Sequence, residues 1–192
     1  MKQPWLTPDG KKIWNTEAQY WSWLRGALRR LWSDYPLRKQ WKASQLRKIT
    51  QEEKDSKKYH PSTKNLGLCA YCNEWLAGSK LECDHVQASN GCTTKETAED
   101  FLWHCGGGTG DDWVLACKPC HSTKTLSDKL GISFQEAVVE QQVIAICKQP
   151  AKQIDSWLDS HNISGYSKNP TSRRNAVRDV LMKQKEEKED EE

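Results

Sequence analysis

The stretch that decides the fold begins with Cys-Ala-Tyr-Cys (69–72) and ends with Cys-Lys-Pro-Cys-His-Ser-Thr-Lys (117–124). In each Cys-x-x-Cys pair the spacing lets a tight turn aim both sulfurs at one tetrahedral ion. Two such pairs in one short segment predict a structural zinc site with the ligands Cys69, Cys72, Cys117 and Cys120. The other cysteines lack paired spacing, so we expect buried thiols rather than a second metal site at Cys83, Cys92, Cys105 and Cys147.

A polar pair lies between the two cysteine pairs, in an otherwise apolar strand expected over residues 81–86. Asp84 and His85 form this pair, and His121 directly follows the last cysteine. Hydrolysis of a phosphodiester needs a base that activates water and a cation that stabilises the leaving oxygen. Neighbouring strand residues point to opposite faces, so both side chains reach one phosphate only where the strand twists or ends. Zinc would hold the architecture, and catalysis would use a harder ion, Mg²⁺ or Mn²⁺.

These residues resemble the HNH endonuclease family, whose ββα-metal core carries Cys-x-x-Cys, Asp-His, an Asn, a second Cys-x-x-Cys, and then His. The resemblance covers residues 69–125. It implies that His85 is the general base, that Asp84 and His121 bind the catalytic metal, and that DNA is the substrate. The family usually has Asn where this chain has Asp112. An Asp there can orient the loop, bind the metal, or only cap a turn.

The flanking segments resemble small free-standing phage HNH proteins. They include an insert with Trp-His-Cys-Gly-Gly-Gly (103–108) and a basic arm rich in tryptophan. His104 is a further candidate for the site, although a single histidine in a glycine-rich loop is more often solvent-facing or structural. The chain shows no apolar run for export near its start and no apolar stretch long enough for a membrane. We therefore expect a cytoplasmic protein, in a bacterial host if phage-encoded, with no membrane partner.

The charge is divided unevenly along the chain. Residues 1–68 carry fifteen Lys and Arg against six Asp and Glu, whereas residues 69–125 carry four against eight. A basic arm beside an acidic module suggests that the arm meets phosphate while the module binds metals. A solvated basic surface explains the same pattern equally well.

A helix expected from Thr16 onward places arginine and indole on one face, which suits a nucleic-acid backbone. The alternative is that its tryptophans, Trp21 and Trp32, pack inside the protein and the arginines cover them. Pro36 predicts the start of a second helix. The residues expected to bind DNA are Arg25, Arg29, Arg30, Lys124, Arg173 and Arg174.

The predicted fold class is a small, zinc-stabilised α+β protein with a treble-clef-like ββα-metal core and mainly helical flanks. The expected parts are a helical arm with a linker (1–64), the core (65–130), a helical C-terminal region (131–182) and an acidic disordered tail (183–192). In the core, the segment between Val86 and the second cysteine pair, rich in Gly, Thr and acidic residues, reads as a long loop. In the C-terminal region, Ser133 is expected to cap one helix and Thr171 or Ser172 another.

Two other functions stay open at this point. One is a treble-clef module that holds nucleic acid without cutting it, and the other is a zinc-built adaptor for packaging or regulation, with tryptophans as interface anchors. The Asp84-His85 pair together with His121 favours the enzyme, because a purely structural zinc module has no need of a polar pair there. The sequence leaves a protein partner and the oligomeric state open.

Overall fold

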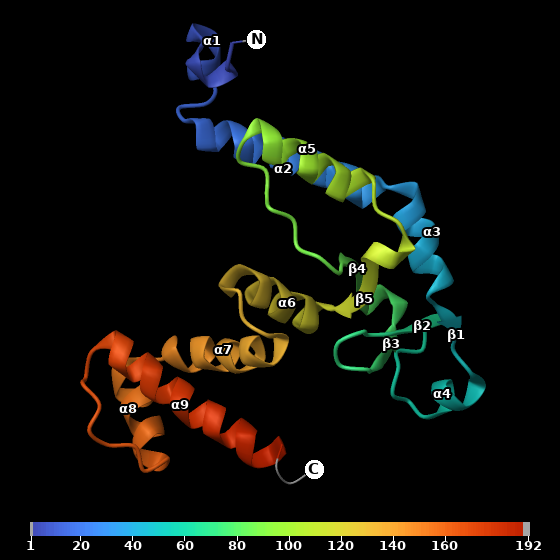
Figure 1. The fold of residues 1–192 in the computed structure, drawn as a ribbon. Helices are drawn as coiled ribbons and strands as arrows, with labels where there is room; N and C mark the ends of the chain where they lie inside the picture. The colour runs from blue at the N-terminus through green and yellow to red at the C-terminus, as the bar shows by residue number, and fades with distance from the viewer. Residues whose placement is uncertain (1, 190–192) are drawn as a thin grey trace. The chain divides into compact units, whose positions relative to one another are not determined.

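The computed structural model describes residues 2–189 and shows a mostly helical α+β fold (Figure 1). The chain divides into two compact units, one ending at His121 and the other beginning at Ser122. Helix α6 (Lys118–Leu130) leaves the first unit and enters the second, so its first turn belongs to the first unit. The predicted class, a small α+β protein with a four-cysteine cluster, is confirmed at this level.

The first unit contains two small antiparallel sheets. The strands β1 (Arg47–Lys48), β2 (Asn65–Leu68) and β3 (Trp75–Ala77) form one sheet in that order, and β4 (Leu81–His85) pairs with β5 (Trp113–Cys117) in the other. His85 is the last residue of β4 and lies opposite Trp113. The strand therefore ends where the sequence required it to end if Asp84 and His85 are to serve one site.

The core beneath the cysteines packs β2 closely against its neighbours. A Cβ atom at Gly67 would come within 2.7 Å of methyl groups of both Leu46 and Leu81, so a larger residue would have to displace these side chains. Leu81 and Leu115 are buried with Cys69 and Cys117 in one cluster. Apolar packing from β4 and β5 thus supports the segment that carries the cysteines.

The helices of the arm begin where the sequence predicts. The Thr16 hydroxyl caps α2 (Glu17–Asp34) by accepting a bond from the Gln19 N–H at 3.3 Å, and Pro36 opens α3 (Pro36–Ser44). Before them lie the short elements η1 (Pro4–Leu6) and α1 (Pro8–Lys11). Helix α5 (Lys95–Gly106) runs along α2 (Figure 1), and a second core between them buries Trp5, Trp21, Cys92, Phe101 and Cys105.

Two segments expected to lack helix contain one. The predicted linker holds α4 (Gln51–Asp55), whose first turn is closed by a reciprocal Thr50–Glu53 capping box. The predicted long loop holds the twelve-residue helix α5, capped by Thr94 and Thr97. The acidic and glycine residues around α5 hid a helical spacing of its apolar positions, Ala98, Phe101 and Cys105. Two further 3₁₀ turns are η2 (Gly78–Lys80) and η3 (Gly110–Asp112).

The second unit is built from α7 (Phe134–Cys147), α8 (Ala151–Ser160) and α9 (Pro170–Glu189) around a core that buries Val143, Leu158 and Val177. The capping box predicted at Ser133 is confirmed, since Ser133 and Glu136 exchange both bonds. The predicted cap of the last helix is wrong by two residues or more. Asn169 provides it, because its Oδ1 accepts a bond from the Ser172 N–H at 2.9 Å.

The expected disordered tail is helical over residues 183–189, because α9 continues to Glu189. Lys and Glu are good helix formers, and the Lys183 ammonium lies 3.9 Å from the Glu187 carboxylate one turn later. Residues 190–192 of the expected tail lie outside the described part of the chain.

Candidate functional site

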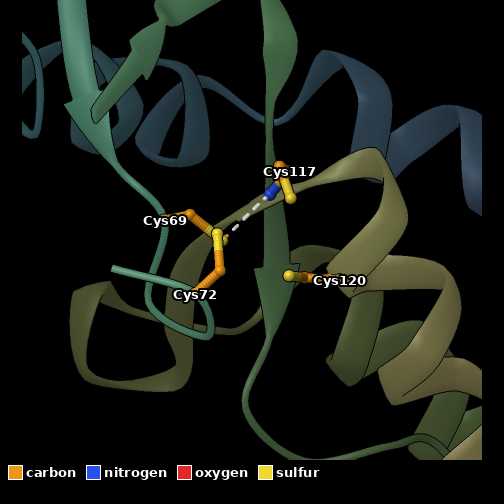
Figure 2. A group of neighbouring side chains, drawn as sticks. All are labelled: Cys69, Cys72, Cys117 and Cys120. Carbon is orange, nitrogen blue, oxygen red and sulfur yellow. Dashed lines mark hydrogen bonds between the residues drawn. The ribbon is translucent and has the colours of Figure 1, made fainter. Parts of the chain in front are cut away.

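The two Cys-x-x-Cys turns bring four sulfurs together, as predicted. Figure 2 shows Cys69 and Cys72 on one turn facing Cys117 and Cys120, which stand at the end of β5 and in the first turn of α6. All four sulfur atoms lie within 4.8 Å of one another. Sulfurs about 2.3 Å from a tetrahedral Zn²⁺ stand roughly 3.8 Å apart, so the cluster fits that ion after a small contraction.

Backbone groups hold the first turn in the shape that a metal knuckle needs. Asn73 takes a left-handed conformation (φ 55°), which asparagine tolerates, and its N–H donates to the Cys69 carbonyl at 3.0 Å. The Ala70 N–H donates to the Leu115 carbonyl at 2.8 Å and ties the turn to β5. The turn is therefore preorganised by the protein itself.

The environment of Cys69 favours a thiolate, the form that binds zinc. Burial pushes the pKa of Cys69 upward, but N–H donors outweigh it and lower the pKa to about 7. The strongest of these donors is the Cys117 N–H, whose nitrogen lies 3.3 Å from the Cys69 sulfur. Figure 2 marks this bond with a dashed line. Burial raises the pKa of the Cys83 thiol to about 11. Cys83 lies outside the four-cysteine cluster and is a buried thiol, as expected.

His121 lies between two carboxylates of β4. Its Nδ1 is 2.6 Å from Glu82 Oε2, and its Nε2 is 3.3 Å from Asp84 Oδ1. Glu82 and Asp84 are two residues apart on one strand and therefore share a face. The structure thus brings together Asp84 and His121, as the sequence predicts, and adds Glu82, which sequence reasoning missed although the alternation of a strand pointed to it.

His85 stands on the other side of the strand end, half-buried among aromatic rings. Its ring centroid lies 4.0 Å from that of Trp32 and 3.7 Å from that of His104. It also lines a pocket of about 350 Å³ with residues of the α5 insert, among them Trp103, His104, Asp111 and Asp112. His104, a weaker candidate from the sequence, therefore lies against His85 in the structure.

Asp112 acts on the loop in the structure. Its Oδ2 accepts a bond from the Thr109 N–H at 2.8 Å, and its carbonyl accepts one from the Val86 N–H at 2.8 Å. Of the three roles open from the sequence, these contacts match the turn cap and the orientation of the loop beside His85.

The residues expected to bind DNA divide into two groups. Arg29 and Arg30 are exposed on α2, and Arg25 is half-buried. The two tryptophans named in the alternative interpretation pack against the protein: Trp21 is 8% exposed, and the Trp32 ring lies against His85. These two are therefore not available as platforms for bases.

The other three predicted DNA ligands are engaged within the second unit. Lys124 is buried and donates a hydrogen bond to Asp128 at 2.5 Å. Arg173 donates two hydrogen bonds to Asp155, at 2.7 and 3.0 Å. Arg174 pairs with Glu140. Ion pairs within the chain account for these side chains, so the predicted phosphate contacts have no support from their placement.

Comparisons with protein-family models, with curated proteins and with solved structures find no match.

Among residues 2–189, no helix combines the length and apolar composition that a membrane span requires.

Proposed function

We propose that this chain is a metal-dependent HNH endonuclease that hydrolyses phosphodiester bonds in DNA. The observation that carries the proposal is the distance of 3.3 Å between His121 Nε2 and Asp84 Oδ1. Asp84 directly precedes His85, and His121 directly follows Cys120 of the four-cysteine cluster. A purely structural zinc module has no need of these three side chains at that place. Strands β4 and β5 followed by α6 would then be the ββα-metal core of the family.

The contacts of His121 suit a metal ligand. A carboxylate only accepts hydrogen bonds, so the 2.6 Å contact with Glu82 makes Nδ1 the donor. In a neutral ring Nε2 is then an acceptor, and it faces Asp84 Oδ1, which is also an acceptor. Two acceptors repel each other, and either a cation between them or a proton on Nε2 removes this repulsion. Adjacent ligands of an octahedral Mg²⁺ at about 2.1 Å stand roughly 3 Å apart, close to the observed separation.

The donor set fits Mg²⁺ or Mn²⁺ as a second ion distinct from the cysteine-bound zinc. Asp84 and His121 would hold it, and Glu82 would orient His121 through the second ring nitrogen. The ion would supply positive charge to the leaving oxygen of the scissile phosphate. His85 would take the proton from the attacking water, and Asp112 would keep its loop in place through the Thr109 and Val86 contacts.

Positive charge on the first unit supports DNA as the substrate. The pocket beside His85 is lined by two carboxylates and by no Lys or Arg, so no Lys or Arg in its lining can pair with a phosphate. The exposed arginines Arg29 and Arg30 on α2 belong to the same unit and supply positive charge outside the pocket. Binding should therefore weaken as salt concentration rises.

The test is a plasmid-nicking assay with Mg²⁺ or Mn²⁺ in which His85→Ala is compared with wild type. We expect a loss of about 10²-fold or more in rate, with zinc content and DNA affinity retained, because a base contributes little to ground-state binding. Asp84→Ala and His121→Ala should also lose activity, and excess Mn²⁺ should partly restore these two variants alone.

Cleavage by His85→Ala at the wild-type rate would place the base elsewhere. A wild-type chain that binds DNA but never cuts it would replace the enzyme with a nucleic-acid-binding module. A chain that does neither would favour a protein-interaction adaptor.

A further inference from the structure

The imidazole of His85 belongs to a column of five planar groups. From one end to the other these are the Arg38 guanidinium, the Trp32 indole, the His85 and His104 imidazoles and the Phe101 ring. Successive centres are separated by 4.7, 4.0, 3.7 and 6.3 Å in that order. The tilt between neighbouring rings is 33°, 30° and 24° along the column from Trp32 to Phe101.

The two inner contacts cover both faces of His85. Rings with centroids 4.0 and 3.7 Å from one imidazole cannot share a face of it, because their own atoms would overlap. Trp32 and His104 therefore lie on opposite faces. Rotation of the His85 ring about its χ2 bond would drive it into one neighbour or the other, so the stack fixes the plane of the ring.

The column is anchored at both ends by groups outside the β4–β5 hairpin. Arg38 donates through Nη1 to the Ser33 carbonyl at 3.1 Å and to the Trp32 carbonyl at 3.3 Å, at the end of α2. At the other end, Phe101 is 4% exposed in the core that α2 and α5 share. The arm and the insert therefore hold the column together as one packed assembly.

We infer that Trp32 and His104 are positioning residues that hold the plane of the His85 ring fixed for its role as the general base. This inference rests on the proposed function and extends it, since the arm and the α5 insert then complete the catalytic site from outside the zinc-bound hairpin. Misplacement of a reacting group by about 1 Å can lower a rate by roughly 10²-fold, so the clamp acts on the chemical step.

His104 is an imidazole, so a direct chemical role has to be separated from stacking. Phenylalanine keeps a flat ring of similar size and removes both nitrogens. His104→Phe should therefore retain most of the activity if stacking is the role, and His104→Ala should not. Trp32→Phe and Trp32→Ala provide the same comparison on the other face of His85.

The experiment measures kcat and KM for DNA cleavage by these four variants in the full-length, zinc-loaded chain. We expect both alanine variants to lose about 10- to 100-fold in kcat with KM nearly unchanged, and both phenylalanine variants to recover most of that loss. The controls are Trp23→Ala on α2 and Leu102→Ala on α5, two exposed side chains on the same helices outside the column. They should cut like wild type.

A second readout reports on the ring itself. The carbon-bound protons of His85 lie between two aromatic faces, so their NMR signals should be shifted upfield in wild type and should move back in His104→Ala. If the wild type cuts DNA, unchanged kcat in both folded alanine variants would overturn the positioning role alone. Loss of activity in His104→Phe equal to that in His104→Ala would assign His104 to the chemistry instead. A wild-type chain that never cuts would overturn the proposed function, and the positioning role with it.

Discussion

Two carboxylates on one face of β4 meet the imidazole of His121 from either side. Glu82 Oε2 contacts Nδ1 at 2.6 Å, and Asp84 Oδ1 lies 3.3 Å from Nε2. Asp84 is the less exposed of the two, with 14% of its side chain accessible against 49% for Glu82. This difference in exposure suits Asp84 as the metal ligand and Glu82 as the outer carboxylate that would fix the tautomer of His121.

At the residue scale, Glu82→Gln should weaken binding of the proposed catalytic metal while leaving the zinc expected at the cysteine cluster in place. The amide keeps the size of the side chain but removes the charge that holds the Nδ1 proton. Loss of such a partner typically costs about 10- to 100-fold in metal affinity. Titration of cleavage activity with Mn²⁺ should therefore show a midpoint shifted upward by that factor. Glu99→Gln, an exposed carboxylate on α5, is the matched control, and an identical Mn²⁺ midpoint in Glu82→Gln would refute the assignment.

At the scale of elements, the cysteine cluster joins the turn that follows β2 to the first turn of α6. Cys120 and His121 are adjacent on that turn, so whatever holds the cysteine also places the histidine. The strand pair β4–β5 ends at the same point, because Cys117 is the last residue of β5. Zinc would therefore act on the candidate catalytic site through the position of a helix start.

We expect one tightly bound zinc per chain, measured by elemental analysis of reduced protein. Removal of the metal by a chelator, or by Cys72→Ser, should raise hydrogen exchange in residues 65–121 and abolish cleavage, without rescue by excess Mg²⁺. The second unit should keep its protection, because α7, α8 and α9 have a core of their own.

Cys147→Ser is the matched control for the zinc experiment, since Cys147 lies in the second unit outside the cluster. It should keep the full zinc content. Reduced wild-type protein prepared without chelators and found free of zinc would refute the structural metal site.

At the scale of the whole molecule, the two units depend on different interactions. The first unit contains the cysteine cluster, whereas the second pairs a helical core with buried ionic contacts. Glu140 on α7 bonds Arg174 and Arg178 on α9, and 7% of its side chain is exposed. Burial raises the pKa of the Glu140 carboxyl, but Arg178 and Arg174 outweigh burial and leave the pKa below its ordinary value.

The second unit should therefore lose stability in acid. A carboxyl with a depressed pKa in the folded state stabilises it above its unfolded pKa, about 4.3 for Glu, and this stabilisation is lost as the pH falls further. The Asp155 carboxyl adds to the effect, because its bonds from Arg173 lower its pKa to about 2. Protection of α7–α9 against hydrogen exchange should fall between about pH 4 and pH 2.

Glu140→Gln tests the origin of this pH dependence. At pH 7 the variant should lose about 1–3 kcal/mol of stability, because two arginines lose their charged partner. The difference from wild type should shrink below about pH 4, because the wild-type carboxyl is then protonated in the unfolded chain and, at lower pH, in the folded chain as well. The exposed pair Lys183–Glu187 offers the control Glu187→Gln, which should change little. A constant difference between wild type and Glu140→Gln from pH 7 to pH 2 would contradict the ionic origin.

The sequence by itself determined the features that depend on short spacing along the chain. The cysteine pairs, the Thr16 and Ser133 caps and the proline at the start of α3 all follow from residues a few positions apart. Local steric and hydrogen-bonding rules act at that range, so these predictions needed no knowledge of packing. The helix α5 was missed although its spacing was local, because glycine and acidic residues around it outweighed the apolar period.

Only the tertiary structure decided which distant residues meet. Glu82 reaches His121 across 39 positions, and Trp32 reaches His85 only because α2 packs along α5. The same holds for Arg173, since its position in the sequence did not predict that it would bond Asp155, 18 positions away. Such choices depend on how helices and strands dock, and docking follows from the sum of many weak contacts that no short stretch of sequence contains.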